Sequence, residues 1–425
     1  MTELSGAAAD SSKDSPPSHG AVRRDDDLAD AADGLGLFTT FQQIVSLPDQ
    51  GIIGYEALAR WPHSHASPEA VFEYAARYGN LELLDSTCIQ AATVSAMGAE
   101  MAAGTTLFVN TEPSTLTPDA LDFTASHRNS LRVVFELTER DLLDHPRALM
   151  AKIASLRARG FGIALDDVGT DDRCLAALDL LAPDVIKLRL QQLHSAPTSR
   201  HAQIMSAVLA HRDRSGAHIL VEGIESPADL DFANAIGAEL GQGFLFGYPG
   251  PVTRTAGEAH WAPPPFRPQP LAPVGQTPFS VVAAASVPRR LTKPAALQLS
   301  RIIEEQALLC ADAPMILTAI QRVEHFSAAT RQLYTRLADT APWVVIFGDR
   351  VPSAPAPGVR GVHLHPDDAM NREWIVLSLG TYSACALACR EVTEGTGPAR
   401  MFDTALTYDR ATVVNAAAAM LHRML

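Results

Sequence analysis

Short apolar runs alternate with longer amphipathic stretches between residues 35 and 250, and each run ends on or near a polar residue. The runs are Gly51–Leu58, Leu107–Asn110, Val133–Glu136, Ile163–Asp166, Val185–Lys187, Ile219–Glu222 and Gly241–Phe244. Many of their positions are β-branched, and their length is that of a strand rather than of a helix. They therefore predict β-strands.

Helix-length stretches separate these runs, at residues 68–78, 84–97, 146–159 and 200–214. Strands that alternate with helices of this length indicate βαβ units, whose strands lie parallel in one sheet. Six or seven such units within about 210 residues suit a (β/α)8 barrel better than an open sheet. We therefore predict an α/β fold with a TIM-like barrel.

The polar residues at the strand ends carry the main chemical signal. In a parallel barrel the carboxyl ends of the strands meet at one rim, where active sites lie. The residues predicted at this rim are Glu56, Asn110, Glu136, Asp166, Asp167, Lys187, Glu222 and Gln242. Clustered carboxylates need a counter-charge. Because oxygen ligands suit hard cations, the sequence predicts Mg²⁺ or Mn²⁺ rather than zinc.

Asp166 and Asp167 stand side by side between an apolar run and the turn at Gly169. Taken alone, the pair allows two interpretations. An aspartate before a helix is a common N-cap residue in a solvated turn. Two adjacent carboxylates at the end of a buried strand also suit a metal site. The acidic residues on the other strand ends favour the metal site.

Composition narrows the class of protein. The chain has 425 residues, of which 47% are hydrophobic, and a formal net charge of −14. This charge argues against binding to a nucleic acid polymer, although a metal ion or a few arginines can still attract a small anion. Five scattered cysteines predict buried thiols rather than a zinc site. The sequence contains no apolar run of membrane-spanning length and no signal-peptide pattern. We therefore expect no membrane association and a cytoplasmic location.

Composition also divides the chain. Residues 1–34 are acidic and polar, which predicts a disordered tail, and residues 35–250 form the predicted barrel. The proline-rich residues 251–277 predict an extended linker. Residues 278–425 predict a second, smaller α/β domain, with helices at 294–311, 328–338 and 410–424 and strands at 343–348, 373–378 and 384–388.

A series of motifs then resembles one family, the EAL-domain phosphodiesterases, which hydrolyse cyclic di-GMP to linear pGpG. The motifs occur in family order over about residues 35–249, and seven ordered motifs are far more specific than the signature tripeptide alone. They are Glu56-Ala57-Leu58, Phe108-Val109-Asn110, Glu136-Leu137-Thr138-Glu139, Asp166-Asp167-Val168-Gly169-Thr170, Asp184-Val185-Ile186-Lys187, Val221-Glu222-Gly223 and Gly241-Gln242-Gly243.

The resemblance implies roles for individual residues. Two ions of Mg²⁺ or Mn²⁺ would be bound, with Asp166 shared between them. The implied metal ligands are Glu56, Asn110, Glu136, Asp166, Asp167 and Glu222. The implied catalytic residues are Glu56, Lys187, Glu222 and Gln242, with Lys187 orienting the attacking water. Two metals can activate a nucleophile and neutralise the phosphate together.

Other matched positions lie around this centre. Gln42, Leu58 and Arg60 match the substrate side, where a guanidinium can pair with a phosphate. Glu139 matches a residue that steadies the loop after Asp167. The partner implied is c-di-GMP, and homodimerisation through the barrel is left open.

The chain departs from the family pattern next to the predicted metal site. The family usually has Gly-Tyr-Ser-Ser where this chain has Asp171-Asp172-Arg173-Cys174. The family also has an aromatic residue at the position of Val168, an aspartate at that of Arg189 and a proline at that of Gln43. None of these changes removes a predicted ligand. They leave a second hypothesis open, a catalytically weak or inactive domain that acts as a c-di-GMP receptor or interaction module. A purely structural protein would require the acidic rim to be incidental.

The second domain resembles the DICT sensory domain, which is attached to cyclic di-GMP enzymes and other signalling proteins. The segments that carry this resemblance are Thr330–Tyr334, Val345–Gly348, Asn371–Trp374 and Arg400–Phe402. No convergent set of acids or histidines identifies a ligand there. We therefore predict a bacterial signalling hydrolase, a c-di-GMP phosphodiesterase governed by a C-terminal sensor whose signal the sequence does not name.

Overall fold

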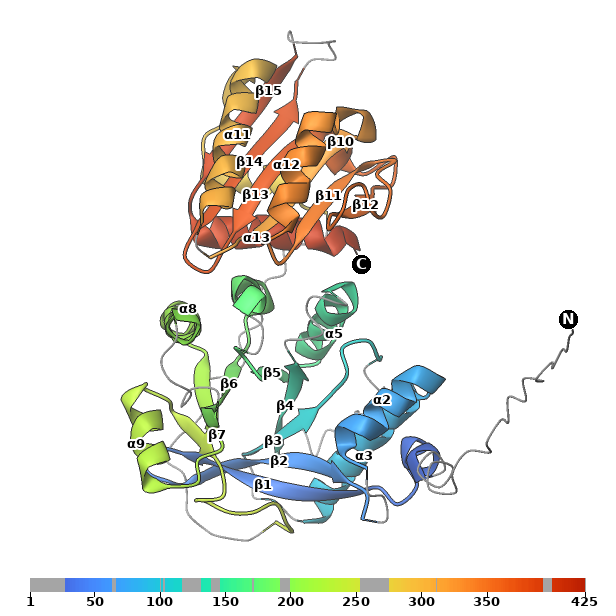
Figure 1. Ribbon diagram of the computed structural model, residues 1–425, viewed down its shortest axis with the longest axis vertical. Helices are drawn as coiled ribbons and strands as arrows, with labels where there is room; N and C mark the ends of the chain where they lie inside the picture. Colours follow the sequence, from blue (N-terminus) through green and yellow to red (C-terminus); the bar gives the residue numbers. More distant parts are fainter. Residues whose placement is uncertain are drawn as a thin grey trace, which may run out of the picture.

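The computed structural model contains two sheets, each formed by one half of the chain (Figure 1). It describes residues 27–62, 66–99, 101, 104–116, 131–138, 146–169, 172–191, 199–252, 275–310, 312–392 and 400–424. Among these residues no helix combines the length and the apolar character needed to cross a bilayer.

The first sheet is a closed barrel of eight strands in sequence order, which confirms the predicted TIM-like fold. Its strands are β1 (Phe38–Ser46), β2 (Ile52–Arg60), β3 (Thr105–Asn110), β4 (Leu131–Thr138), β5 (Gly162–Asp166), β6 (Val185–Arg189), β7 (His218–Glu222) and β8 (Leu240–Gln242). From β2 to β8 neighbouring strands are parallel, whereas β1 runs antiparallel to both β2 and β8. The barrel is therefore a variant in which the first strand is reversed.

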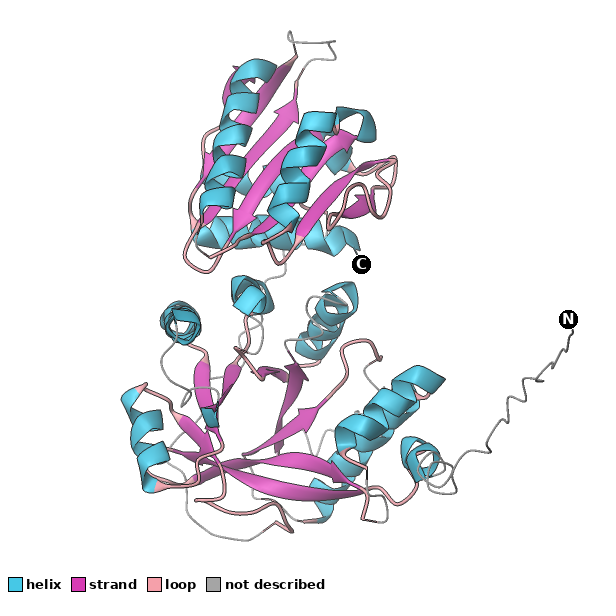
Figure 2. Cartoon of the chain, in the orientation of Figure 1, coloured by secondary structure: helices cyan, strands magenta, loops and turns pink. Residues whose placement is uncertain are grey.

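Helices cover the outside of the barrel (Figure 2). They are α2 (Pro68–Tyr78), α3 (Leu81–Gly98), α5 (Pro146–Ala158), α6 (Leu178–Leu181), α8 (Ser199–Ser215) and α9 (Pro227–Ala235), with the 3-10 helix η2 (Asp172–Ala177) before α6. Local sequence sets their ends. Ser67 caps the N-terminus of α2, and Gly79 ends it with a φ of 82°, a conformation that favours glycine.

A layer of apolar side chains fills the barrel below the rim. It contains Ile44, Ile53, Phe108, Val134, Ala164, Val185, Leu220 and Leu240, one from each strand. On β3 to β8 each of these residues stands two positions before the polar residue that ends or nearly ends its strand. Because strand side chains alternate with a period of two, both members of each pair point into the barrel. The apolar layer thus forms the floor beneath the polar ring.

The second sheet has seven strands in the order β12-β11-β10-β13-β14-β15-β9. These are β9 (Arg289–Thr292), β10 (Met315–Arg322), β11 (Val344–Asp349), β12 (Arg360–His363), β13 (Glu373–Leu379), β14 (Ala384–Glu391) and β15 (Met401–Thr407). Helices α11 (Lys293–Leu309) and α12 (Ala328–Ala338) pack on one face, and α10 (Pro278–Ala285) with α13 (Arg410–Leu421) on the other. The smaller α/β domain is therefore confirmed.

Several details differ from the expectation. Residues 27–32 are helical, with Ala31 and Ala32 buried against Trp61, so ordered structure begins before residue 35. Strand β1 was not predicted, because Thr39, Thr40 and Gln42-Gln43 interrupt its apolar pattern. The central strand β10 was also missed. Residues 1–26 and 253–274 lie outside the described residues, so the tail, the linker and the domain boundaries remain predictions.

Candidate functional site

A ring of polar side chains lies at one end of the barrel. Its members come from the seven parallel strands. Those on β3 to β8 lie at or near the C-terminal ends, as the sequence predicted, whereas Glu56 lies in the middle of β2. They are Glu56 on β2, Asn110 on β3, Glu136 on β4, Asp166 on β5, Lys187 on β6, Glu222 on β7 and Gln242 on β8. Strand register holds neighbouring members level, since Asn110 pairs with Glu136 and Glu222 with Gln242.

Lys187 occupies the centre of this ring and is only 1% exposed. Its Nζ lies 2.6 Å from Glu222 Oε1 and 2.8 Å from Glu136 Oε1. The same Nζ is 3.5 Å from Glu56 Oε2 and 3.6 Å from Asp166 Oδ1. One buried ammonium group therefore faces four carboxylates.

Amide side chains fix the orientation of Glu56. Asn110 Nδ2 donates a hydrogen bond to Glu56 Oε1 at 3.1 Å, and Gln242 Nε2 donates to Glu56 Oε2 at 2.7 Å. Gln242 also donates to Gln42 Oε1 at 3.1 Å. Gln42 in turn is opposite Glu56 in the β1–β2 ladder. Both oxygens of the carboxylate are thus held in place by neutral donors.

Burial and mutual repulsion shift the pKa values of the ring. Burial, together with the charge of Glu56, raises the pKa of Glu136 well above its usual range. Burial also raises the pKa of Glu222 to about 7, although Lys187 opposes the shift. Burial acts on Glu56 too, but Lys187 and the Gln242 hydrogen bond outweigh it and lower the pKa. Without added cations, these shifts favour protons on Glu136 and Glu222 over Glu56.

Asp166 and Asp167 differ in backbone conformation. Asp166 ends β5, whereas Asp167 has a φ of 59°, a left-handed conformation that is costly outside glycine. The Asp167 backbone N–H donates to Asp166 Oδ1 at 2.8 Å. Ligand oxygens of Asp166, Asp167 and Glu222 lie within 4.8 Å of one another. The turn therefore directs two adjacent carboxylates to the same side of the ring.

These residues fit hard divalent cations. The carboxylates of Glu56, Glu136, Asp166, Asp167 and Glu222 carry up to five negative charges, and Lys187 with Arg189 supplies two positive ones. The remaining charge is balanced either by the protons just described or by cations. Carboxylate and amide oxygens at one rim match the ligand preference of Mg²⁺ and Mn²⁺.

A cavity of about 230 Å³ opens onto the ring. Its walls include Gln42, Glu56, Asp166, Arg189, Glu222, Glu225, Gln242 and Phe244. Phe244 and Tyr248, both exposed, stack with ring centroids 4.4 Å apart beside this opening. This aromatic pair was not predicted, because the dipeptide Gly243-Phe244 alone carries no signal for stacking.

Two predicted substrate residues lie farther along β2. Leu58 and Arg60 follow Glu56 at intervals of two, so their side chains lie on the same face of the strand. Neither residue lines the cavity. Glu139 lies outside the described residues, as does Asp171. Only the backbone of residues 172–174 is described, as the first turn of η2.

A buried cluster that the sequence analysis missed supports Asn110. Asp85 on α3 accepts hydrogen bonds from the hydroxyl groups of Thr111, at 3.1 Å, and Thr115. Lys152 Nζ lies 3.7 Å from the same carboxylate. All four residues are buried, and Thr111 directly follows Asn110. The cluster therefore anchors the loop that leaves β3 at the ring.

Comparison with known proteins identifies the family. The family model described as "EAL domain" matches residues 25–249, more than half of the 425-residue chain. The chain belongs to the EAL family. A second model, described as "Sensory domain in DIguanylate Cyclases and Two-component system" and named DICT, matches residues 280–392. The EAL barrel and the DICT domain correspond to the two sheets.

Curated relatives resemble the EAL half. The chain is 31% identical to the cyclic di-GMP phosphodiesterase RocR of Pseudomonas aeruginosa, over 53% of this chain and 61% of that protein. It is 29% identical to the probable cyclic di-GMP phosphodiesterase PdeG of Escherichia coli, over 48% of this chain and 43% of that one. The matches thus span from under half to about three fifths of these relatives.

Among solved structures, the chain is similar to the PaMucR phosphodiesterase in a c-di-GMP complex. The sequence identity is 27% and the TM-score 0.44, over 54% of this chain and 98% of that chain.

Proposed function

We propose that the EAL barrel is a phosphodiesterase that hydrolyses c-di-GMP to linear pGpG with two divalent cations, Mg²⁺ or Mn²⁺, under control of the DICT domain. The observation that carries this proposal is the complete ring of ligand side chains around Lys187. Membership of the EAL family and the names of the relatives support the substrate.

The ring residues would hold the cations. One ion would be held by Asp166, Asp167 and Glu222. The other would be held by Asp166 together with Glu56, Asn110 and Glu136. When bound, such ions supply positive charge to the phosphate oxygens and acidify a water molecule. The chain itself fixes the ligands in advance, because neutral donors orient Glu56 and strand register sets the spacing of the rest.

Lys187 would hold the attacking water and the phosphate in position through its Nζ. Its contacts with four carboxylates raise its pKa well above the usual range although burial opposes this, so Nζ stays protonated and can only donate. Glu222 Oε1, at 2.6 Å from Nζ, is the acceptor nearest to that group and would receive a proton from the water. Gln242 would orient Glu56 rather than transfer protons.

Substrate would enter through the cavity above the ring. Arg189 lines this cavity and is half exposed, so its guanidinium can reach a phosphate oxygen. The stacked Phe244 and Tyr248 would offer an aromatic face to a guanine base, since bases stack readily on such rings. Arg60, on the Glu56 face of β2, would add positive charge farther out.

The test is hydrolysis of c-di-GMP by the full-length protein with Mn²⁺, with the product identified by chromatography against pGpG. Glu56→Gln should reduce the rate on the order of a hundredfold or more, because it removes a ligand charge from the ring. Glu305→Gln, an exposed site on α11, is the matched control and should retain the rate. Absence of pGpG, or equal rates for wild type and Glu56→Gln, would refute the proposal.

A second candidate is a c-di-GMP receptor with little turnover. One observation favours it, since Arg189 forms an ion pair with Asp167 and so occupies a ligand carboxylate. Calorimetry would then show saturable binding of c-di-GMP with Mn²⁺, while chromatography shows no product. Homodimerisation through the barrel remains a separate prediction, and sedimentation of the full-length protein tests it.

A further inference from the structure

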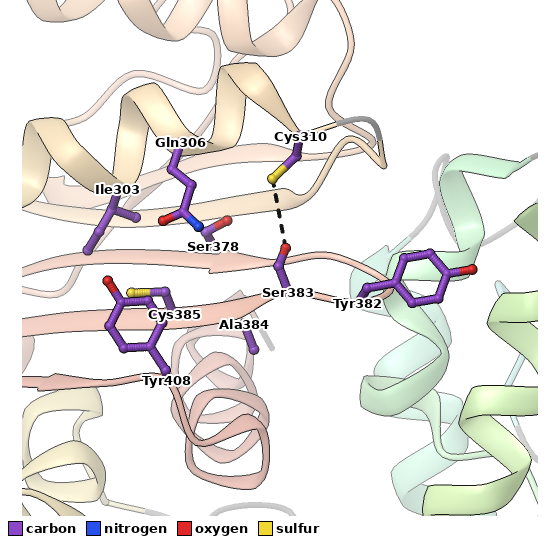
Figure 3. A pocket seen from close by; sticks show the side chains of 9 residues that line it. All are labelled: Ile303, Gln306, Cys310, Ser378, Tyr382, Ser383, Ala384, Cys385 and Tyr408. Atoms are coloured by element: carbon purple, nitrogen blue, oxygen red, sulfur yellow. Dashed lines mark hydrogen bonds between the residues drawn. The ribbon is translucent and has the colours of Figure 1, made fainter.

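The DICT domain contains a cavity of about 240 Å³ between α11 and the sheet (Figure 3). Ile303 and Gln306 on α11 form one wall, with Cys310 just after the helix. Ser378 on β13 and Cys385 on β14 form the floor. The remaining lining residues are Tyr382, Ser383, Ala384 and Tyr408. The cavity lies on the side of the sheet that α11 covers.

The lining is polar but uncharged. It offers an amide, several hydroxyl groups and two thiols, and among the described residues no Asp, Glu, Lys, Arg or His contributes to it. The Ser378 hydroxyl, on a buried residue, and the Gln306 amide both line this space, so both are placed to serve a ligand. Burial raises the pKa of Cys385 to about 11, which keeps this thiol neutral.

The size of the cavity limits the occupant. Pockets that hold drug-sized molecules measure roughly 300–1,000 Å³, so this cavity suits a smaller compound. Ile303 and the ring of Tyr408, which lies beside Cys385 in Figure 3, provide apolar contact area. The geometry points to a small, uncharged ring compound with a hydrogen-bonding group.

One wall of the cavity also contacts the EAL barrel. In the turn between β13 and β14, the Tyr382 hydroxyl donates to the backbone carbonyl of Gln203 on α8 at 3.2 Å. Figure 3 shows the Tyr382 ring directed away from the cavity towards the green helices of the barrel. Arg410 Nη2 donates to the carbonyl of Gly380 in the same turn at 2.7 Å, and Arg410 Nε pairs with Asp179 on α6.

This connection leads to the ring. Helix α6 directly follows η2, and η2 begins five residues after Asp167. We propose that the cavity is the sensory site of the DICT domain, that it binds a small uncharged ring compound, and that its occupancy shifts the turn at residues 380–383 and, through Arg410 and Asp179, the segment at residues 172–181. The site itself does not depend on the proposed hydrolysis.

Binding is tested on the full-length protein with four neutral probes, benzamide, nicotinamide, phenol and indole, against the charged benzoate and benzylammonium. Saturation-transfer NMR should detect binding of at least one neutral probe. Its affinity should be at least tenfold higher than that of the charged probes. Ser378→Leu, which fills the floor, should abolish this signal, whereas Ser378→Ala leaves the space open and retains it. Failure of all neutral probes, equal binding of charged ones, or unchanged binding to Ser378→Leu would overturn the site.

The effect of the cavity on residues 172–181 can be measured without any hydrolysis assay. Hydrogen exchange at residues 172–181 should change at least twofold when the neutral probe that binds is added to the wild type. Arg410→Gln should remove this change while retaining probe binding. Arg290→Gln, whose partner Asp403 lies on β15, is the control and should respond as the wild type does. An unchanged exchange rate, or the same response in Arg410→Gln, would refute the route.

Discussion

Arg189 forms an ion pair with Asp167, the residue that leaves β5 in a left-handed conformation. The guanidinium is half exposed, and its Nε also lies 3.8 Å from Glu222 Oε2. Both carboxylates belong to the group whose oxygens lie close enough to hold a cation. Arg189 therefore neutralises the side of the ring on which Asp167 stands.

Removing this charge should strengthen cation binding. Arg189→Ala removes this ion pair from Asp167, and we expect the Mn²⁺ affinity measured by calorimetry to rise roughly threefold to tenfold, on the order of 1 kcal/mol. Arg60→Ala is the control, because the Arg60 guanidinium donates to the carbonyl of Ala59 instead. Weaker Mn²⁺ binding in Arg189→Ala, or an equal gain in Arg60→Ala, would show that Arg189 does not compete with the cation.

The sequence predicted the ring because its chemistry is local. Each polar residue lies at or near the end of its own apolar run. A parallel barrel brings these ends together at one rim, independently of the length and sequence of the loops. The contact between Arg189 and Asp167 was not predicted, since it depends on the unusual φ of Asp167. Nor was the pair of Asp179 and Arg410, because 231 residues separate them and no periodicity links the two domains.

The second sheet shows the same limit. Its helices α11 and α12 follow from amphipathic periodicity, which is a local signal. The edge strand β9 pairs with β15, where Leu291 is opposite Phe402. Only four residues long and largely exposed, β9 has no apolar run of its own. Its position depends on tertiary pairing that the sequence pattern does not encode.

Lys187→Met should destabilise the fold, because the four carboxylates around Lys187 then repel one another without a counter-charge. Removing one partner from a buried charge cluster costs roughly 3–5 kcal/mol. We therefore expect a lower thermal midpoint without metal and a partial recovery with Mn²⁺, because cations can replace the lost positive charge. Lys152→Met removes the buried partner of Asp85, outside the ring, so its midpoint should stay below that of the wild type by the same amount with and without Mn²⁺. Equal responses of the two variants would contradict this explanation.

Asp85→Asn should disturb the ring from a distance. The substitution weakens the hydrogen bonds from Thr111 and Thr115 and leaves Lys152 without its counter-charge. Because Thr111 follows Asn110, we expect c-di-GMP hydrolysis to fall about tenfold, within the range seen for supporting residues of metal sites. The rate is measured with saturating Mn²⁺, and the exposed Asp231→Asn serves as control. A full rate in Asp85→Asn would restrict the cluster to a purely structural role.

Asp179 joins the two domains and should be sensitive to acid. Burial opposes its ionisation, but the His211 hydrogen bond and the charge of Arg410 lower its pKa below the usual range. A carboxyl group with a lowered native pKa stabilises the fold above its unfolded pKa of about 3.9 and loses this contribution as the pH falls through the native value.

Asp179→Asn should therefore lower the thermal midpoint by roughly 5–10 °C at pH 5, since it leaves Arg410 and His211 without their carboxylate. Between pH 5 and pH 3 the difference from the wild type should shrink, because the carboxyl group of the unfolded wild-type chain takes up protons near its ordinary pKa of about 3.9 while the native carboxylate stays ionised. Asp213→Asn, at an exposed site on α8, is the matched control and should change little at either pH. A difference that stays constant down to pH 3, or an equal loss in Asp213→Asn, would show that the domains are not held together by this carboxylate.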